Sequence, residues 1–178
     1  RFADIEILRF KVDRWEELSL QQKTMIYYLS EAAACGRDIV FDQNCAYNLY
    51  IKDALENIID SYSGDKSCAD FEKFLVYVKR FWFSNGMHHH YSNAKFFPEV
   101  TKEYFGILLS KSNSSGFYLP EGYTLETYKT WITNLIFDPQ IAPIKIVQDN
   151  AQDLVLNSSA NFYEGVTQKE VEDYYKNV

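Results

Sequence analysis

The chain has 178 residues, of which 47% are hydrophobic and 24% charged, so it is large enough to bury a core and is neither a disordered segment nor a coiled coil. Its net charge of −7, without a basic stripe, argues against nucleic-acid binding, which requires cations that neutralise phosphates. No apolar run approaches the roughly 20 residues that a membrane-spanning helix needs. The three cysteines form no CxxC pair, so we expect free thiols, with one disulfide as the alternative.

Aromatic residues make up 17% of the chain. Each ring buries a large area at low entropic cost, so this abundance indicates a rigid core. A cleft that holds peptide or base rings is the alternative.

The first predicted helix starts at Ser19, which forms a capping box with Gln22. We expect Gly36 to end it in a left-handed conformation. Its apolar face consists of Met25, Ile26, Leu29, Ala32 and Ala33.

Two stronger helical patterns follow, both with the i, i+3, i+4, i+7 spacing of a buried face. One covers Ile51, Ala54, Leu55, Ile58, Ile59 and Tyr62 and ends near Gly64. The other starts near Cys68 and covers Phe71, Phe74, Leu75, Val78 and Trp82. We expect this helix to end before Gly86.

Later helices are predicted from Thr101 and from Thr124. Between them lies a polar loop near 111–116, which we expect to be flexible. A second capping box, Thr167 with Glu170, begins a last helix that runs to residue 178 in the middle of its apolar stripe.

Strand signals are weak. Residues 144–147 alternate briefly and are compatible with a short strand or an extended connector, and residues 5–12 with a strand or a helix. We therefore predict a mainly α protein with at most one or two short strands, forming a single helical domain over 1–178. The terminal stripe and the missing initiator Met lead us to expect that the chain is truncated after 178 and belongs to a longer one.

All three histidines are adjacent, at His88, His89 and His90, followed by Tyr91. Imidazole is a common metal ligand, which suggests a metal site using His88 and His90. Neighbouring residues of an extended loop point in alternating directions, and no HExxH spacing is present, so this is the weaker interpretation. An ordinary polar loop and a metal-free ligand contact are the alternatives.

A resemblance to a known family bears on these interpretations of the histidine loop. The segment 70–98 resembles the N-terminal region of the dipeptidyl peptidase III family, and the motifs that carry the resemblance are Phe74-Leu75-Val76-Tyr77, Ser84-Asn85-Gly86 and Lys95-Phe96-Phe97-Pro98. Further matches are Tyr28-Leu29-Ser30-Glu31-Ala32-Ala33, Gly36-Arg37-Asp38-Ile39, Phe41-Asp42-Gln43-Asn44 and Asn161-Phe162-Tyr163. The bacterial, Bacteroides-type branch is the most similar.

The resemblance implies the helical portion of the N-terminal lobe of a two-lobed zinc metallopeptidase that releases dipeptides from peptide N-termini. Such an enzyme holds zinc through an HExxGH helix and a later Glu, which this sequence lacks. We therefore expect zinc in the full-length enzyme, no cofactor and no activity in this chain alone, and as partners oligopeptide substrates and the catalytic lobe of the same protein.

By position, the resemblance assigns Tyr91 to the pocket for the substrate's N-terminal residues, with His90 beside it. The family usually has Phe where Tyr91 stands, and its animal members lack the three histidines. A Tyr91 ring that packs on its own domain is the alternative for that residue. The alternative for the whole chain is a noncatalytic helical interaction module whose histidine loop binds metal or a partner.

We expect a cytoplasmic protein. Export to the periplasm, or a lipid anchor, stays open because the true N-terminus is absent from the sequence.

Overall fold

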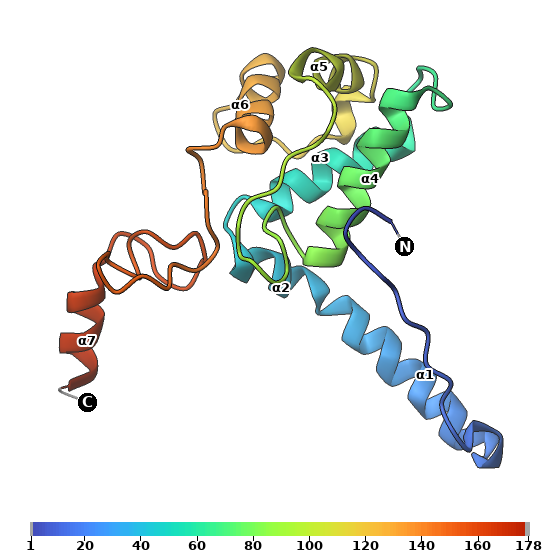
Figure 1. Cartoon of the computed structure of the whole chain (residues 1–178). Coiled ribbons are helices and arrows are strands. Elements are labelled where there is room, and N and C mark those ends of the chain that lie inside the picture. The colour runs from blue at the N-terminus through green and yellow to red at the C-terminus, as the bar shows by residue number, and fades with distance from the viewer. Residues whose placement is uncertain (1, 177–178) are drawn as a thin grey trace.

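A computed structural model describes residues 2–176 and confirms a mainly helical fold (Figure 1). Its helices in chain order are the 3-10 helix η1 (Trp15–Glu17), α1 (Leu20–Cys35), α2 (Arg37–Asn44), α3 (Asn48–Ser61), α4 (Ala69–Ser84), α5 (Lys102–Ser110), the 3-10 helix η2 (Ser114–Gly116), α6 (Leu125–Phe137) and α7 (Gln168–Lys176). Helix α3 lies at the centre and contacts α2, α4, α5 and α6.

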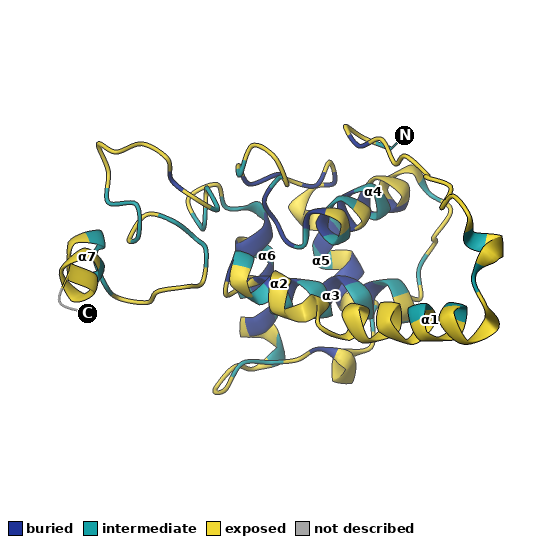
Figure 2. Ribbon diagram, turned by 90° about the horizontal axis from the view of Figure 1, so that it is seen from below, coloured by how far each residue is buried: buried dark blue, intermediate teal, exposed yellow. Residues whose placement is uncertain are grey.

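The hydrophobic core is formed by the five helices from α2 to α6 and their loops, and the buried residues gather there in Figure 2. The predicted stripe of α3 is confirmed, since Ile51, Ala54, Leu55 and Ile58 are fully buried. In α4 the predicted Leu75 and Trp82 lie at the edge of the core and are only half-buried. The rings of Tyr77 and Phe81 take the interior positions instead.

The predicted helix starts are present. Ser19, Thr101 and Thr124 each accept a hydrogen bond from the backbone N–H three residues later. At the last helix the carboxylate of Glu170 accepts from the backbone N–H of Thr167, whose hydroxyl accepts in return from the N–H of Glu170. These caps are formed by neighbours in sequence, so the sequence was sufficient to find them.

The predicted left-handed stop at Gly36 is wrong. Gly36 has φ −81° and ψ 0°, a right-handed conformation, and the chain turns directly from α1 into α2. Glycine permits a left-handed cap but does not require one. Helix α2, which the helical pattern did not predict, packs on the core through Phe41.

The apolar face of α1 is not buried by the described part of the chain. No residue of this helix is buried, and Met25 and Leu29 are 56% and 61% exposed. Figure 1 shows α1 projecting away from the other helices, beside the N-terminal segment. The pattern identified the helix correctly, but within residues 2–176 its apolar side chains are exposed apart from Ile26, which is half-buried.

The surface area reflects this open arrangement. The chain exposes 11915 Å², whereas a compact protein of 20.9 kDa exposes about 9,000 Å². Helices α1 and α7, which are mostly exposed in Figure 2, contribute to this area.

Neither candidate strand forms. Within residues 2–176 the strand-like pairing is limited to isolated bridges, which join Phe2 to Ile5, His88 to Lys95 and Ala94 to Ile144. Residues 144–147 have one bridge, at Ile144, and bends at the next two positions, and residues 6–12 are irregular. A strand requires a neighbouring strand for its hydrogen bonds, and none lies beside these segments.

The polar loop between α5 and α6 contains η2 and is held to α3. The side-chain amide of Asn57 donates to the carbonyl of Asn113, and the hydroxyl of Ser61 accepts from the N–H of Asn113. Its flexibility stays a prediction.

The three cysteines are free thiols, as expected. No helix within residues 2–176 is long and apolar enough to cross a membrane. The predicted continuation of the last helix to residue 178 lies outside the described residues.

Candidate functional site

The histidine loop, residues 87–96, begins where α4 ends. Asn85 has φ 51° and Gly86 has φ 139°, a conformation that strongly favours glycine at the second position. A Cβ atom at Gly86 would overlap the amide of Asn48. That amide, which is fully buried, accepts from the N–H of Met87 and donates to the carbonyl of Phe41. The loop therefore leaves the core in one fixed direction.

Backbone hydrogen bonds close the histidine loop like a small hairpin. His89 donates to the carbonyl of Ala94, and Phe96 donates to that of Met87. Both ends of this hairpin are buried, with Met87 at 0% and Phe96 at 7% exposure. Tyr91 stands at the tip and is 87% exposed. A buried base thus carries an exposed aromatic ring.

His88 faces inward. It is 2% exposed, and its Nε2 lies 2.8 Å from the carbonyl oxygen of Ala142, so Nε2 carries the proton and donates. Burial, and the cations of Lys95 and Lys145, lower its pKa to about 4. His88 is therefore neutral at physiological pH, and its Nδ1 has no hydrogen-bond partner among residues 2–176.

His89 faces the N-terminal segment. Its Nε2 lies 3.1 Å from Oδ2 of Asp4, while its Nδ1 accepts hydrogen bonds from the N–H groups of Tyr91 and Ser92. One imidazole thus shapes the turn at the loop tip and ties the loop to Asp4. Arg80 of α4 also reaches Asp4, with Nε 3.3 Å from Oδ1.

The two residues predicted to contact substrate lie together at the exposed side of the loop. His90 packs edge-on against Phe83, with ring centroids 4.9 Å apart, and its pKa is lowered by burial and then by His89. Tyr91 beside it leaves most of its ring uncovered by the described part of the chain. The two side chains are accessible to a ligand.

The described residues contain no cluster of metal-ligating side chains that would support a metal site at the histidine loop. Within residues 2–176 no group of three His, Cys, Asp or Glu side chains is placed to hold a metal ion. His88, one of the two candidate ligands, directs Nε2 to a carbonyl in the interior, whereas His90 lies at the surface. The residues present here do not fit a zinc site.

Sequence reasoning missed Lys95, which holds the base of the loop. Its ammonium donates to the carbonyls of Asp138 and Ile141, at 2.6 and 2.9 Å. Lys95 is only 8% exposed, and burial lowers its pKa to about 8. A lysine directly followed by two phenylalanines was the one signal in the sequence that could have indicated a buried cation.

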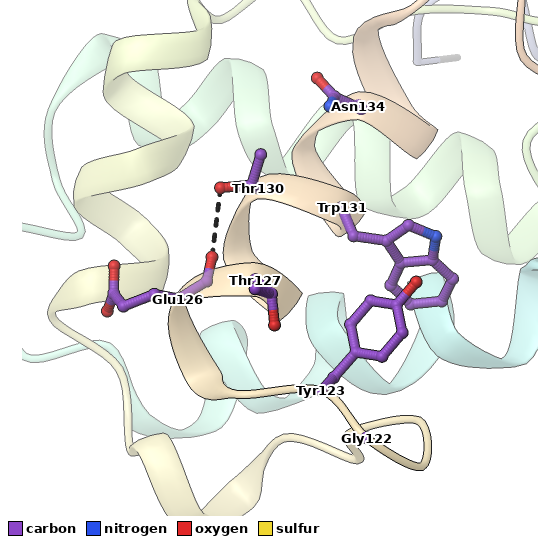
Figure 3. Close-up of a pocket in the computed structure, with 7 residues that line it drawn as sticks. All are labelled: Gly122, Tyr123, Glu126, Thr127, Thr130, Trp131 and Asn134. Carbon is purple, nitrogen blue, oxygen red and sulfur yellow. Dashed lines mark hydrogen bonds between the residues drawn. The ribbon is translucent and has the colours of Figure 1, made fainter.

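A hollow lies on α6, and none of its lining residues belongs to the histidine loop (Figure 3). Its volume is 650 Å³, and its aromatic wall is made by Tyr123 and Trp131, whose ring centroids are 5.3 Å apart. The remaining lining residues are Gly122, Glu126, Thr127, Thr130 and Asn134. Sequence reasoning did not single out this surface.

Comparison with known proteins adds no family to this geometry: no family model matches the chain, and no curated protein matches it.

Proposed function

We propose that this chain is the substrate-binding side of the N-terminal lobe of a zinc-dependent dipeptidyl peptidase. The observation that carries the proposal is the placement of Tyr91, an exposed ring at the tip of a loop whose base is buried. The ordered motifs described above supply the peptidase assignment, since the loop lies between two of them.

The loop is suited to hold a peptide end because its tip is oriented before a ligand arrives. The backbone N–H of His89 donates to the carbonyl of Ala94, and the imidazole of His89 accepts hydrogen bonds from two backbone N–H groups at the tip. These hydrogen bonds keep the turn closed. Preorganisation of this kind lowers the entropic cost of binding. Tyr91 would then supply a flat apolar surface with a hydroxyl at its edge, and His90 a polar neighbour.

No step of peptide hydrolysis is assigned to this chain. A zinc peptidase polarises the scissile carbonyl and a water molecule through the metal. The residues described here do not form a metal site. In the proposed enzyme that chemistry belongs to a catalytic lobe outside residues 2–176, and Tyr91 and His90 contribute binding and orientation.

The test uses an enzyme chain that contains this sequence together with an HExxGH helix. Tyr91→Ala is expected to raise KM for dipeptidyl arylamides about tenfold, to change kcat less, and to leave the zinc content unchanged. Tyr28→Ala, a change at another exposed tyrosine, on α1, is the control. Unchanged kinetics in Tyr91→Ala would refute the pocket assignment. A parent chain without any HExxGH helix would refute the peptidase assignment itself.

The exposed apolar face of α1 favours a second candidate, a noncatalytic interaction module. Leu20, Met25 and Leu29 of this helix are each more than half exposed. Such a module would hold a partner on α1 without peptidase activity. Tight dipeptide binding at Tyr91 in the chain alone, seen as chemical-shift changes of residues 89–92, would favour the peptidase lobe over the module.

A further inference from the structure

Five aromatic side chains meet at the surface between α3 and α6. We call this set the aromatic ledge; it consists of Tyr47, Tyr50, Tyr118, Tyr123 and Trp131. Trp131 is its centre, with the rings of Tyr50 and Tyr123 at centroid distances of 5.2 and 5.3 Å. Tyr118 stacks on Tyr50 at 5.7 Å. The ledge thus joins residues from α3 and α6, from the turn just before α3 and from the loop between η2 and α6.

The ledge lies at the outer edge of the core: Tyr50 and Trp131 are half-buried and pack against it, whereas the other three rings reach solvent. Tyr118 is 65% exposed, and Tyr47 and Tyr123 are each 37% exposed. Exposed rings in contact with one another form a rigid apolar surface, because each ring restricts its neighbours. Grouped exposed aromatic residues mark binding surfaces more often than single ones do.

A hollow lies on each side of the ledge. The first is the 650 Å³ hollow of Figure 3, walled by Tyr123 and Trp131. The second has a volume of 570 Å³ and is bordered by Tyr50 and Tyr118. Since Tyr50 contacts Trp131, the two hollows share the ledge as a common wall.

The second hollow carries an excess of negative charge. Its charged lining residues are Asp38, Asp42, Asp53, Glu56 and Lys52. Four carboxylates thus face one ammonium. Lys52 lies 3.2 Å from Asp38 and 3.4 Å from Glu56, so its charge is shared between two of them. Asp53 accepts the N–H of Tyr118 and Asp42 an amide N–H of Asn161, both neutral donors.

This combination selects a cationic ligand. A guanidinium can stack on tyrosine and tryptophan faces while its N–H groups bond to carboxylates, and it is less strongly hydrated than an ammonium. Nucleic acid is disfavoured by the same carboxylates. A neutral sugar would use the rings but would leave the excess charge unmatched.

We propose that the aromatic ledge and the acidic hollow beside it bind an arginine-containing basic segment of a partner protein. The side chain of an arginine lies on the ring of Tyr118, and its guanidinium faces Asp53 and Asp42, which line the same hollow. No residue of this surface belongs to the histidine loop, so the proposal stands whether or not the peptidase assignment does.

The probe is a short fluorescein-labelled peptide of alternating Gly and Arg, with Gly-Lys and Gly-Glu peptides of equal length for comparison. Fluorescence anisotropy with this chain is expected to show the Arg peptide binding severalfold more tightly than the Lys peptide, and at least about tenfold more tightly than the Glu peptide. Affinity for the Arg peptide is expected to fall several-fold between about 50 and 300 mM salt.

Because the whole chain is negatively charged, single variants must separate the ledge from a diffuse attraction. Tyr118→Ser and Asp53→Asn are each expected to weaken Arg-peptide binding about threefold or more, and together about tenfold. Their matched controls are Tyr28→Ser, at 66% exposure and with a ring neighbour as Tyr118 has, and Glu31→Gln on the same exposed helix. The controls are expected to bind as the unmodified chain does.

Three results would overturn the proposal. The first is equal affinity for the Arg and Glu peptides. The second is equal weakening by the ledge variants and by their controls, which would mean a diffuse charge effect. The third is a neutral oligosaccharide that shifts the indole signal of Trp131 while the Arg peptide does not, which would assign the ledge to a glycan. Thermal melts of all four variants, expected to match that of the unmodified chain, confirm that folding is intact.

Discussion

The Nε2 atom of His89 lies 3.1 Å from Oδ2 of Asp4, across 85 positions of sequence, and joins the histidine loop to the N-terminal segment. Arg80 reaches the same carboxylate from α4. Burial alone would raise the pKa of Asp4, but its backbone hydrogen bond, Arg80 and His89 together lower it. Asp4 is thus held in the ionised form that both partners require.

The two nitrogens of His89 have separate roles that substitutions can divide. His89→Asn retains an acceptor near the Nδ1 position, whereas His89→Gln retains a donor near the Nε2 position. We expect the amides of Tyr91 and Ser92 to exchange with solvent faster in His89→Gln and to stay protected in His89→Asn, because Nδ1 accepts from both. Hydrogen exchange measured by NMR checks this. Equal protection in the two variants would contradict the assigned roles.

His88 makes the fold sensitive to acid. Its pKa is about 4 in the folded chain against an ordinary 6.5, so the unfolded chain binds more protons between these values. The free energy of unfolding should therefore have its full value above pH 6.5. It should fall as the pH drops toward 4, by up to about 3 kcal/mol. Urea titrations across this range measure the effect. His88→Gln keeps a donor for the carbonyl of Ala142 without a titrating group, and its stability should depend less on pH; an identical slope would contradict the prediction.

Lys95 makes the stability of the fold rise with pH, as His88 does, but at alkaline pH. Its pKa is about 8 when folded against an ordinary 10.5, so the unfolded chain again binds more protons and stability should rise from pH 8 upward. Above about pH 10 the buried Tyr77 and Tyr128, whose pKa burial raises, oppose this gain. Comparison of urea midpoints at pH 8 and about 9.5 tests it.

The matched variant is Lys95→Met, which fills the same space without a charge. It should remove the alkaline rise, and it should also lower the free energy of unfolding by about 2–4 kcal/mol, because the carbonyls of Asp138 and Ile141 lose their donor. A variant as stable as the unmodified chain would show that these carbonyls find other partners.

Gly86 and Gly106 form a contrasting pair. Gly86→Ala requires a side chain at φ 139° and places it on Asn48, so we expect a loss of about 3 kcal/mol or more. Gly106 lies within α5 with no atom near a new Cβ, and Gly106→Ala should stabilise by about 0.5–1 kcal/mol. Thermal unfolding of both variants provides the test, and opposite signs are the expected result.

Local signals allowed much of the fold to be predicted. Ser19, Thr101 and Thr124 cap helices that the structure contains, because a cap depends on residues three positions apart. The stripe of α3 was equally clear, since its spacing matches the helical repeat. Gly36 shows the limit of such signals: it lies between two helices in a conformation that any residue could adopt.

The candidate site divides in the same way. The sequence by itself placed three histidines and Tyr91 in one loop after α4 and showed that this chain holds no HExxGH zinc motif. Only the tertiary structure decided that His88 faces inward, that His89 faces Asp4 and that Tyr91 is exposed, and only it assembled the aromatic ledge from α3, α6, the turn before α3 and the loop before α6. The physical reason is that helix caps and stripes arise between neighbours in sequence. The direction of a loop side chain depends instead on partners such as Ala142 and Asp4, which lie 54 and 85 positions away.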